Sequence, residues 1–153
     1  MARRFQIRTT AVVCLTAIAA FLAILAFQHV LRLTGNFHTV VSGEFYRSSQ
    51  LSPAALEGYI KRYGIKSVVN LRGAAPDAAW YREEKAVTAS LGVGLIDFGM
   101  SATHPLPPAR AAELVAVLRE APRPILVHCL DGADRTGLVS VILRVPFLSG
   151  IWW

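Results

Sequence analysis

Residues 125–137 read ILVHCLDGADRTG, and this stretch decides the kind of fold that the chain can adopt. The apolar run at 125–128 follows a Pro-Arg-Pro break, which predicts a buried strand. A loop around Gly132 is expected next, because glycine permits a tight or left-handed turn, and a helix should follow from Thr136 through Arg144. A strand that leads through such a loop into a helix N-terminus makes an anion cradle, since backbone N–H groups point inward and the helix dipole adds positive potential.

Cys129 stands at the entrance to this loop, and Arg135 follows six positions later. The cradle's potential is expected to lower the thiol pKa from its free value of about 8.5, which would make Cys129 a thiolate nucleophile near neutral pH. The guanidinium of Arg135 can fold back across the loop and hold two phosphate oxygens, and the hydroxyl of Thr136 can donate to the sulfur. The combination of apolar strand, glycine loop and Arg-Thr-Gly favours this interpretation over a buried cysteine beside a surface arginine.

Upstream of this stretch, strand-like and helix-like segments alternate. Strands are predicted around residues 45–47, 65–71 and 93–98, and helices at 53–63, 77–91 and 109–121. In the second of these helices, Arg82, Glu83, Glu84 and Lys85 are expected on the side that faces water. The alternation predicts an α/β fold in which a mostly parallel sheet is flanked by helices, with the site beyond the carboxyl ends of the strands.

The segment HCLDGADRTG at 128–137 resembles the signature of the cysteine-dependent protein-tyrosine and dual-specificity phosphatases. Two upstream stretches, GEFYRSSQLS at 43–52 and GIKSVVNLRG at 64–73, are similar to bacterial members and to the atypical plant and fungal members. The resemblance implies that Cys129 attacks phosphorus to form a cysteinyl-phosphate, that Arg135 and the loop amides hold the equatorial oxygens, and that water then hydrolyses the intermediate. It implies no metal or other cofactor.

The same resemblance gives roles to the neighbours of the nucleophile. His128 and Gly137 should support the loop, His128 through a backbone hydrogen bond, and Asp134 should orient Arg135 or bind water. The residues expected to bind substrate are Leu130, Asp131, Gly132, Ala133, Asp134 and Thr136.

The family also uses an upstream aspartate as general acid, and Asp97 at the end of a predicted strand is the best candidate. The alternative is an ordinary aspartate that caps a turn. Asp77 and His104 are weaker candidates for the acid. Arg47 and Arg72 follow or end strands, where they could draw in an anion or could be solvated surface arginines.

The substrate class is expected to be a phosphotyrosine, phosphoserine or phosphothreonine protein, because Asp131 places an acid in the phosphate loop. A carboxylate there should repel a polyanion and disfavours phosphoinositides and inositol pyrophosphates. A lipid or inositol phosphatase is one alternative. The other is an inactive, truncated phosphatase-like protein that binds phosphorylated partners.

The N-terminal part of the chain contains an uncharged run, AVVCLTAIAAFLAILAF at residues 11–27. At 1.5 Å per residue the run is roughly 26 Å long, and extension to residue 31 matches a bilayer core of about 30 Å. Arg3, Arg4 and Arg8 precede it, so residues 1–10 should stay in the cytoplasm and the rest should lie on the extracytoplasmic, periplasmic side. The prediction is a single-pass transmembrane anchor at 11–31, a linker at 32–42 and a phosphatase domain at 43–153. A cleaved signal sequence, which would make the protein secreted, and a buried core helix are the alternatives.

Charge and cysteine content limit the remaining possibilities. The net charge is +6, but no run of five basic residues occurs, so we expect no nucleic-acid partner. Cys14 lies in the apolar run, which leaves Cys129 without an intradomain disulfide partner. The final residues, VPFLSGIWW, resemble a truncated end: Pro146 should break the last helix, and relatives continue with further helices.

Overall fold

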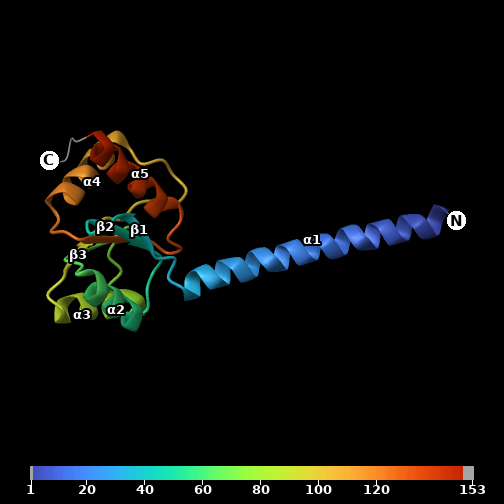
Figure 1. Cartoon of the computed structure of the whole chain (residues 1–153), viewed down its shortest axis with the longest axis horizontal. Coiled ribbons are helices and arrows are strands. Elements are labelled where there is room, and N and C mark those ends of the chain that lie inside the picture. Colours follow the sequence, from blue (N-terminus) through green and yellow to red (C-terminus); the bar gives the residue numbers. More distant parts are fainter. Residues whose placement is uncertain (1, 150–153) are drawn as a thin grey trace. The chain divides into compact units, whose positions relative to one another are not determined.

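The computed structural model describes the backbone of residues 2–149 and the side chains of residues 12–30 and 34–144. The chain forms two compact units, Met1–Thr34 and Gly35–Trp153. The first unit is helix α1, Ala2–Leu33 (Figure 1). Its segment Val12–Val30 has a mean hydropathy of 2.1 and exposes its apolar side chains. By length and composition this segment could cross a membrane, and a signal sequence near an N-terminus has the same properties.

Within the described residues, the second unit contains a five-stranded sheet in the order β1-β2-β5-β3-β4. The strands are β1 His38–Val41, β2 Phe45–Ser48, β3 Ser67–Asn70, β4 Gly94–Asp97 and β5 Ile125–His128. Strand β1 runs antiparallel to β2, and the pairings β2–β5, β5–β3 and β3–β4 are parallel. The predicted α/β fold with a mostly parallel sheet is therefore confirmed, with β1 as its one antiparallel edge strand.

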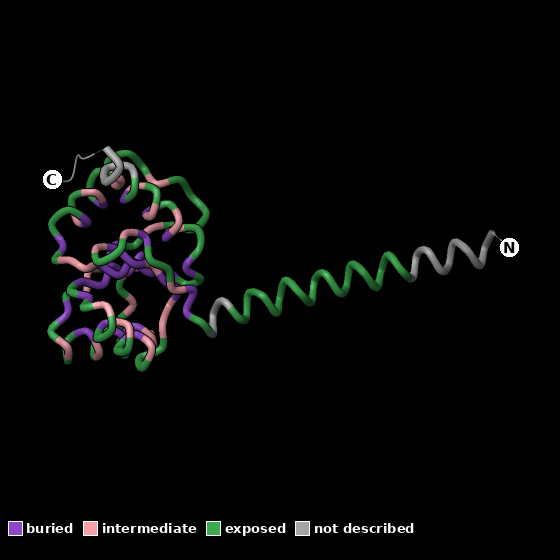
Figure 2. The backbone as a smooth tube through the Cα atoms, in the orientation of Figure 1, coloured by how far each residue is buried: buried purple, intermediate pink, exposed green. Residues whose placement is uncertain are grey.

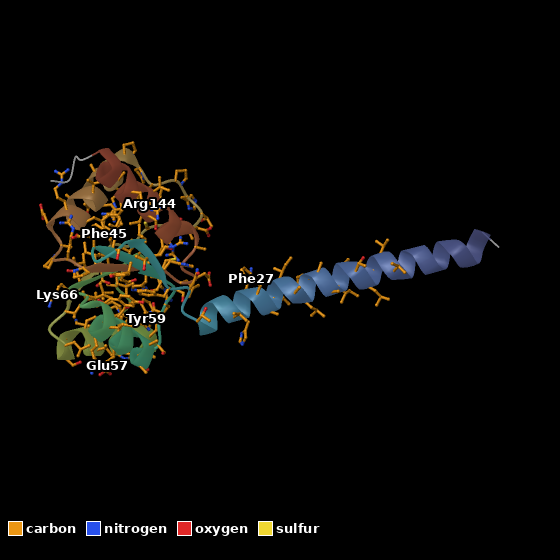
Figure 3. All side chains as sticks on the ribbon, viewed as in Figure 1. Phe27, Phe45, Glu57, Tyr59, Lys66 and Arg144 are labelled. Atoms are coloured by element: carbon orange, nitrogen blue, oxygen red, sulfur yellow. The ribbon has the colours of Figure 1, made fainter. Side chains whose placement is uncertain are left out.

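Helices cover both faces of this sheet (Figure 1). Helices α2 (Pro53–Tyr63) and α3 (Ala79–Ser90) lie on one face, and α4 (Pro108–Glu120) and α5 (Asp134–Ser149) lie on the other. Buried backbone concentrates in the sheet between the two helical layers (Figure 2). Figure 3 shows side chains filling the space on both faces, with Phe45 on the α4/α5 side and Tyr59 on the α2/α3 side.

Successive residues of each strand point to opposite faces, and this alternation divides the core into two clusters. In β5, Leu126 packs with the α2/α3 cluster, whereas Ile125 and Val127 pack with the α4/α5 cluster. In β3, Val68 and Val69 divide in the same way. Because both faces are covered, the middle residues of both strands are apolar, as in parallel strands generally.

The ends of helix α2 follow the local signals in the sequence. Ser52 accepts a hydrogen bond from the Ala55 N–H at 3.3 Å, and Pro53 occupies the first turn, where its missing N–H costs nothing. Gly64 ends the helix with φ +63°, in the left-handed region that glycine adopts without strain.

Three expectations differ from the structure. Residues 35–42, expected in a linker, belong to the compact unit, and residues 38–41 form β1, which pairs with β2. Helix α5 continues through Pro146 to Ser149, since a proline removes only one helical hydrogen bond and can be accommodated by a local bend. Glu84, expected on the water-facing side of its helix, is only 4% exposed.

Candidate active site

The carboxyl ends of four strands lie side by side and form the floor of the site. Ser48 of β2 pairs with His128 of β5, His128 pairs with Asn70 of β3, and Asn70 pairs with Asp97 of β4. Parallel strands in register place these residues in one row and point their side chains to the same face of the sheet. Ligand sites of α/β proteins lie just beyond such a row.

Cys129 leaves β5 at the head of helix α5, which begins at Asp134. The thiol is buried, with 3% of the residue exposed, and Sγ accepts a hydrogen bond from the Gly132 N–H at 3.2 Å. The loop therefore turns a backbone donor toward the sulfur, and the positive end of the α5 dipole lies beyond it. This is the predicted cradle of strand, loop and helix N-terminus.

The loop reaches this shape only because residue 132 is glycine. Gly132 has φ +68°, and a Cβ there would lie 2.5 Å from the Ser49 nitrogen and 2.7 Å from the Ser48 carbonyl carbon. The Ser48–Ser49 backbone, at the end of β2, thus packs directly against the loop. A side chain at position 132 would collide with backbone rather than with a flexible group.

Arg135 lies in the first turn of α5, and its guanidinium reaches the ends of two neighbouring chain segments. Nη1 donates to the Leu71 carbonyl oxygen at 3.2 Å and to that of Met100 at 3.4 Å. Both described contacts use Nη1, so they orient the planar group from one of its nitrogens. The Met100 contact also places the segment after β4 beside this arginine.

The other predicted loop residues divide into exposed and buried ones. Leu130, Asp131, Ala133 and Asp134 are exposed, whereas Thr136 is 1% exposed. The sequence predicts that the Thr136 hydroxyl donates to the sulfur. In the structure it donates to the Ala133 carbonyl oxygen instead, at 3.4 Å. Asp134 is the first residue of α5, where a carboxylate complements the helix dipole.

Asn36 contacts this loop from far away in the sequence, and the sequence analysis missed it. Its Nδ2 donates to the carbonyl oxygens of Asp131 and Gly132, both at 2.9 Å, and its Oδ1 lies 2.8 Å from His38 Nε2. Asn36 is 8% exposed and has φ +43°, a conformation that asparagine tolerates better than most residues. Asn36 falls in the predicted linker, and no local pattern around it indicates this partner.

Asp97 occupies the strand end that was predicted, but its carboxylate faces helix α3. Oδ1 accepts from Asn70 Nδ2 at 2.8 Å, and Oδ2 accepts from the Tyr81 hydroxyl at 2.5 Å. This hydrogen bond, with burial and the negative charges of Asp97 and Glu84, raises the pKa of Tyr81 to about 12. Both carboxylate oxygens of Asp97 therefore accept hydrogen bonds on the α3 side of the sheet. The acid role of Asp97 stays a prediction, and these contacts give it a structural role as well.

The weaker acid candidates lie elsewhere. Asp77 is exposed before α3, and its carbonyl oxygen accepts from Arg82. His104 is exposed in the segment 99–107, with Nδ1 within 3.1 Å of the Ser101 and Thr103 hydroxyl oxygens. Among the described residues, no group of three or more His, Cys, Asp and Glu side chains could hold a metal ion.

His128 and Arg72 have polar partners on the α3 side of the sheet. His128 is expected to bind loop backbone, but its Nε2 lies 2.8 Å from Glu84 Oε1 instead. Arg72 Nη1 donates to Gln50 Oε1 at 2.9 Å, and its guanidinium stacks 3.5 Å from the centre of the Trp80 ring. Burial and the nearby Arg135 lower the pKa of Arg72, although three negative groups near it oppose the shift.

Arg47 points to the opposite face of the sheet. Its Nη1 would lie 3.8 Å from a Cβ at Gly137, in the first turns of α5. It lines a hollow of about 480 Å³ between β1 and α5 that does not include Cys129 or Arg135. Of the two arginines considered as anion attractors, Arg72 is the one placed near the cradle.

The sequence matches a family model described as DSP-PTPase phosphatase fused to NAD+ kinase, over residues 13–145. No curated protein sequence matches the chain. Solved structures do match it. The core catalytic domain of the PP-IP phosphatase SIW14 from S. cerevisiae, solved with citrate, has 28% identity and a TM-score of 0.61, covering 71% of this chain and 64% of its own length. The chain therefore spans less than two thirds of that relative.

TpbA from P. aeruginosa is similar at 26% identity and a TM-score of 0.54, covering 78% of this chain and 67% of its own length. A cysteine-to-serine variant of TpbA has been solved in complex with phosphotyrosine, and it matches with 25% identity and a TM-score of 0.54 over the same shares of the two chains. These structures share the α/β phosphatase fold described above.

Proposed function

Because the chain belongs to the family of DSP-PTPase phosphatases described as fused to NAD+ kinase, we propose that it hydrolyses phosphomonoesters through a cysteinyl-phosphate intermediate. The observation that carries the proposal is the cradle itself. The Gly132 N–H points at Cys129 Sγ at 3.2 Å, at the head of α5, and Arg135 in the first turn of that helix has its guanidinium oriented by the Leu71 carbonyl oxygen. This arrangement offers one nucleophile, one planar cation and backbone donors to a single tetrahedral anion.

The reaction proceeds in two displacements. The Cys129 thiolate attacks phosphorus, the P–S bond forms, and the ester P–O bond breaks as the leaving oxygen takes a proton. Water then attacks phosphorus, the P–S bond breaks, and the thiolate and inorganic phosphate are released. In both transition states, negative charge on the equatorial oxygens is stabilised by Arg135 and by the loop N–H groups.

The proposed substrate is a phosphorylated protein side chain, with phosphotyrosine favoured. TpbA, of similar fold, has been solved with phosphotyrosine. In this chain Asp131 is exposed in the phosphate loop, and the segment 99–107, GMSATHPLP, contains no lysine or arginine. A substrate with several phosphate groups would need more positive charge at this rim, and a carboxylate there would repel it.

An inositol pyrophosphate is the second candidate, because SIW14 is described as a PP-IP phosphatase and has 28% identity to this chain. The two candidates are separated by comparing kcat/KM for a phosphotyrosine peptide with kcat/KM for an inositol pyrophosphate. Preference for the second substrate would overturn the argument from Asp131.

The test of the chemistry uses the full chain purified in detergent and a small aryl phosphate. Hydrolysis is expected in the presence of a chelator and should be blocked by vanadate. Cys129→Ser should abolish it, because a serine hydroxyl is not ionised near neutral pH. Cys14→Ser, in the exposed α1 segment, is the matched control and should keep full activity. Equal activity of the two variants would refute the cysteine mechanism, and phosphopeptide binding without turnover would identify an inactive binding protein.

We also propose that α1 anchors the protein in a membrane, with the sheet-containing unit on the extracytoplasmic side. The support is the segment Val12–Val30 and the three arginines before it. A reporter active only outside the cytoplasm, fused after Thr34, should be active and should sediment with membranes. Activity in the soluble periplasmic fraction would instead indicate a cleaved signal sequence, and recovery in the cytoplasm would refute both.

A further inference from the structure

Helix α3 places one buried acid against the strand that carries the nucleophile. Tyr81, Glu84 and Thr88 recur at helical spacing and form the buried face of α3. Tyr81 reaches the end of β4, and Glu84 reaches the end of β5, where its Oε1 lies 2.8 Å from His128 Nε2. The Glu84 and His128 side chains are 3% and 2% exposed, so this pair is shielded from water.

Burial of these two polar side chains costs free energy in the folded state, so a role in function explains the pair better than a role in stability. The ring N–H is not aligned with the carboxylate, so the contact is an electrostatic one rather than a linear hydrogen bond, although the atoms are close. Among the described side chains, Glu84 Oε2 and His128 Nδ1 have no hydrogen-bond partner. Apolar residues of similar volume often match or exceed the stability of such buried pairs.

Glu84 is also linked, through Gln50, to the phosphate loop and to Arg72. Gln50 Nε2 donates to Glu84 Oε1 at 3.4 Å, and the Gln50 backbone N–H donates to the Leu130 carbonyl oxygen in the phosphate loop at 3.1 Å. Gln50 Oε1 in turn accepts from Arg72, which stacks on Trp80. Arg72 lies within electrostatic reach of Arg135 and Cys129 as well as of Glu84. Glu84 is thus a junction between the residue before the nucleophile and a second arginine near the cradle.

We propose that Glu84 is a positioning residue for the reaction. From behind β5 its carboxylate holds the His128 ring, and so fixes the residue that leads directly into Cys129. Through Gln50 it also fixes Arg72 at the rim. This role rests on the proposed phosphatase function, but one of its consequences, the reactivity of the Cys129 thiolate, can be measured without any phosphate ester.

The variant that tests the role is Glu84→Gln, which keeps the shape and removes the charge. Its matched control is Glu83→Gln, the same change at the exposed neighbouring position. For Glu84→Gln we expect kcat/KM on an aryl phosphate to fall about tenfold, because a displacement of about 1 Å in an active site can cost about 10² in rate and the shift of His128 should be smaller than that. The melting temperature is measured alongside, because removing one partner of a buried pair can itself lower stability. Glu83→Gln should stay within about twofold of the parent, as exposed substitutions usually do.

The second measurement is alkylation of Cys129 by iodoacetamide as a function of pH, in a Cys14→Ser background. Here the rate should fall about three- to tenfold in Glu84→Gln, because a shift of His128 moves the adjacent Cys129 sulfur away from the Gly132 N–H that faces it at 3.2 Å. In His128→Asn, adding Glu84→Gln should change the rate by less than about twofold, because the interaction between the pair is already gone. A parent that is alkylated in this way but hydrolyses no ester would refute the phosphatase function and leave the Glu84 role supported.

Two results would overturn the role of Glu84. One is an alkylation profile of Glu84→Gln that coincides with that of Glu83→Gln. The other is a loss of rate that follows a fall in melting temperature and disappears on cooling, because a merely structural glutamate would behave in that way.

Discussion

Replacement of Gly132 by alanine is the sharpest test of the phosphate loop, because the structure gives both the cost and a set of controls. Gly132, Gly64 and Gly92 have nearly the same positive φ, of +68°, +63° and +66°. At Gly64 and Gly92 an added Cβ would meet nothing within 4 Å, whereas at Gly132 it would lie 2.5 Å from the Ser49 nitrogen. The three alanine variants therefore share one penalty, and only Gly132→Ala adds a collision.

The shared penalty is the cost of a left-handed conformation for an L-residue, about 1–2 kcal/mol. The collision is larger than the loop can absorb in place, because non-bonded carbon contacts normally begin near about 3.5 Å, so a shift of about 1 Å is needed. Ser49 will not supply that shift, since its N–H donates to the Gly35 carbonyl oxygen at 2.8 Å and the residue is 1% exposed. The phosphate loop must move instead, and a displacement of about 1 Å in an active site can cost about 10² in rate.

The assay compares kcat/KM on an aryl phosphate with the free energy of unfolding for the three variants. Gly64→Ala and Gly92→Ala should lose about 1–2 kcal/mol of stability and keep their activity, because both positions end helices far from the cradle in sequence. Gly132→Ala should lose at least as much stability and about 10² in kcat/KM. If Gly132→Ala keeps the activity of the two controls, the close approach of the loop to Ser48–Ser49 does not set the catalytic geometry.

The other contacts of the site give three further predictions. Asn36→Gly keeps the positive φ but removes both side-chain hydrogen bonds to the loop carbonyls. We therefore expect a loss of about 1–2 kcal/mol in unfolding free energy, together with weaker vanadate binding. Equal vanadate affinity would show that these hydrogen bonds do not hold the loop in its binding shape. Asp97→Asn should lower the rate on an alkyl phosphate by about 10²–10⁴, and far less on an activated aryl phosphate, if Asp97 is the general acid; equal losses on both would remove it from the mechanism. The same variant should return the Tyr81 pKa from about 12 toward its ordinary value, and ultraviolet absorbance titration, with Tyr81→Phe to assign the signal, measures this shift. Because the folded-state pKa of Tyr81 is raised, its contribution to stability should be complete below the ordinary tyrosine pKa of about 10 and should be lost as the pH rises toward 12.

The sequence predicted those parts of the fold whose signals are local. The apolar run 125–128, the glycine at 132 and the helix start near residue 134 are neighbours in the chain, so their pattern alone indicates a strand, a loop and a helix N-terminus. Helix α2 begins after Ser52 and ends at Gly64 for the same reason, since each cap acts on backbone groups within one turn.

The parts that the sequence did not predict depend on contacts between distant segments. Asn36 and the loop carbonyls that it binds are 95 and 96 residues apart, and nothing near Asn36 in the chain shows that partner. Glu84 stands in the charged run Arg-Glu-Glu-Lys, which is typical of a solvated helix face. Its burial follows only from its helical spacing to Tyr81 and Thr88, which are buried on the same face.

Strand parity explains why Asp97 lies at the predicted end of β4 and still faces away from the nucleophile. Asn70, Asp97 and His128 are in register, so all three side chains point toward the α2/α3 side, whereas Cys129 and Phe98, one position later, belong to the α4/α5 cluster. Asp97 also lies two strands from β5, about 10 Å across the sheet at the usual strand spacing. A proton donor for the cradle would therefore reach it most directly from the segment that follows Phe98 on the α4/α5 side. That segment contacts Arg135 through the Met100 carbonyl oxygen, and His104 is the only ionisable side chain in residues 99–107.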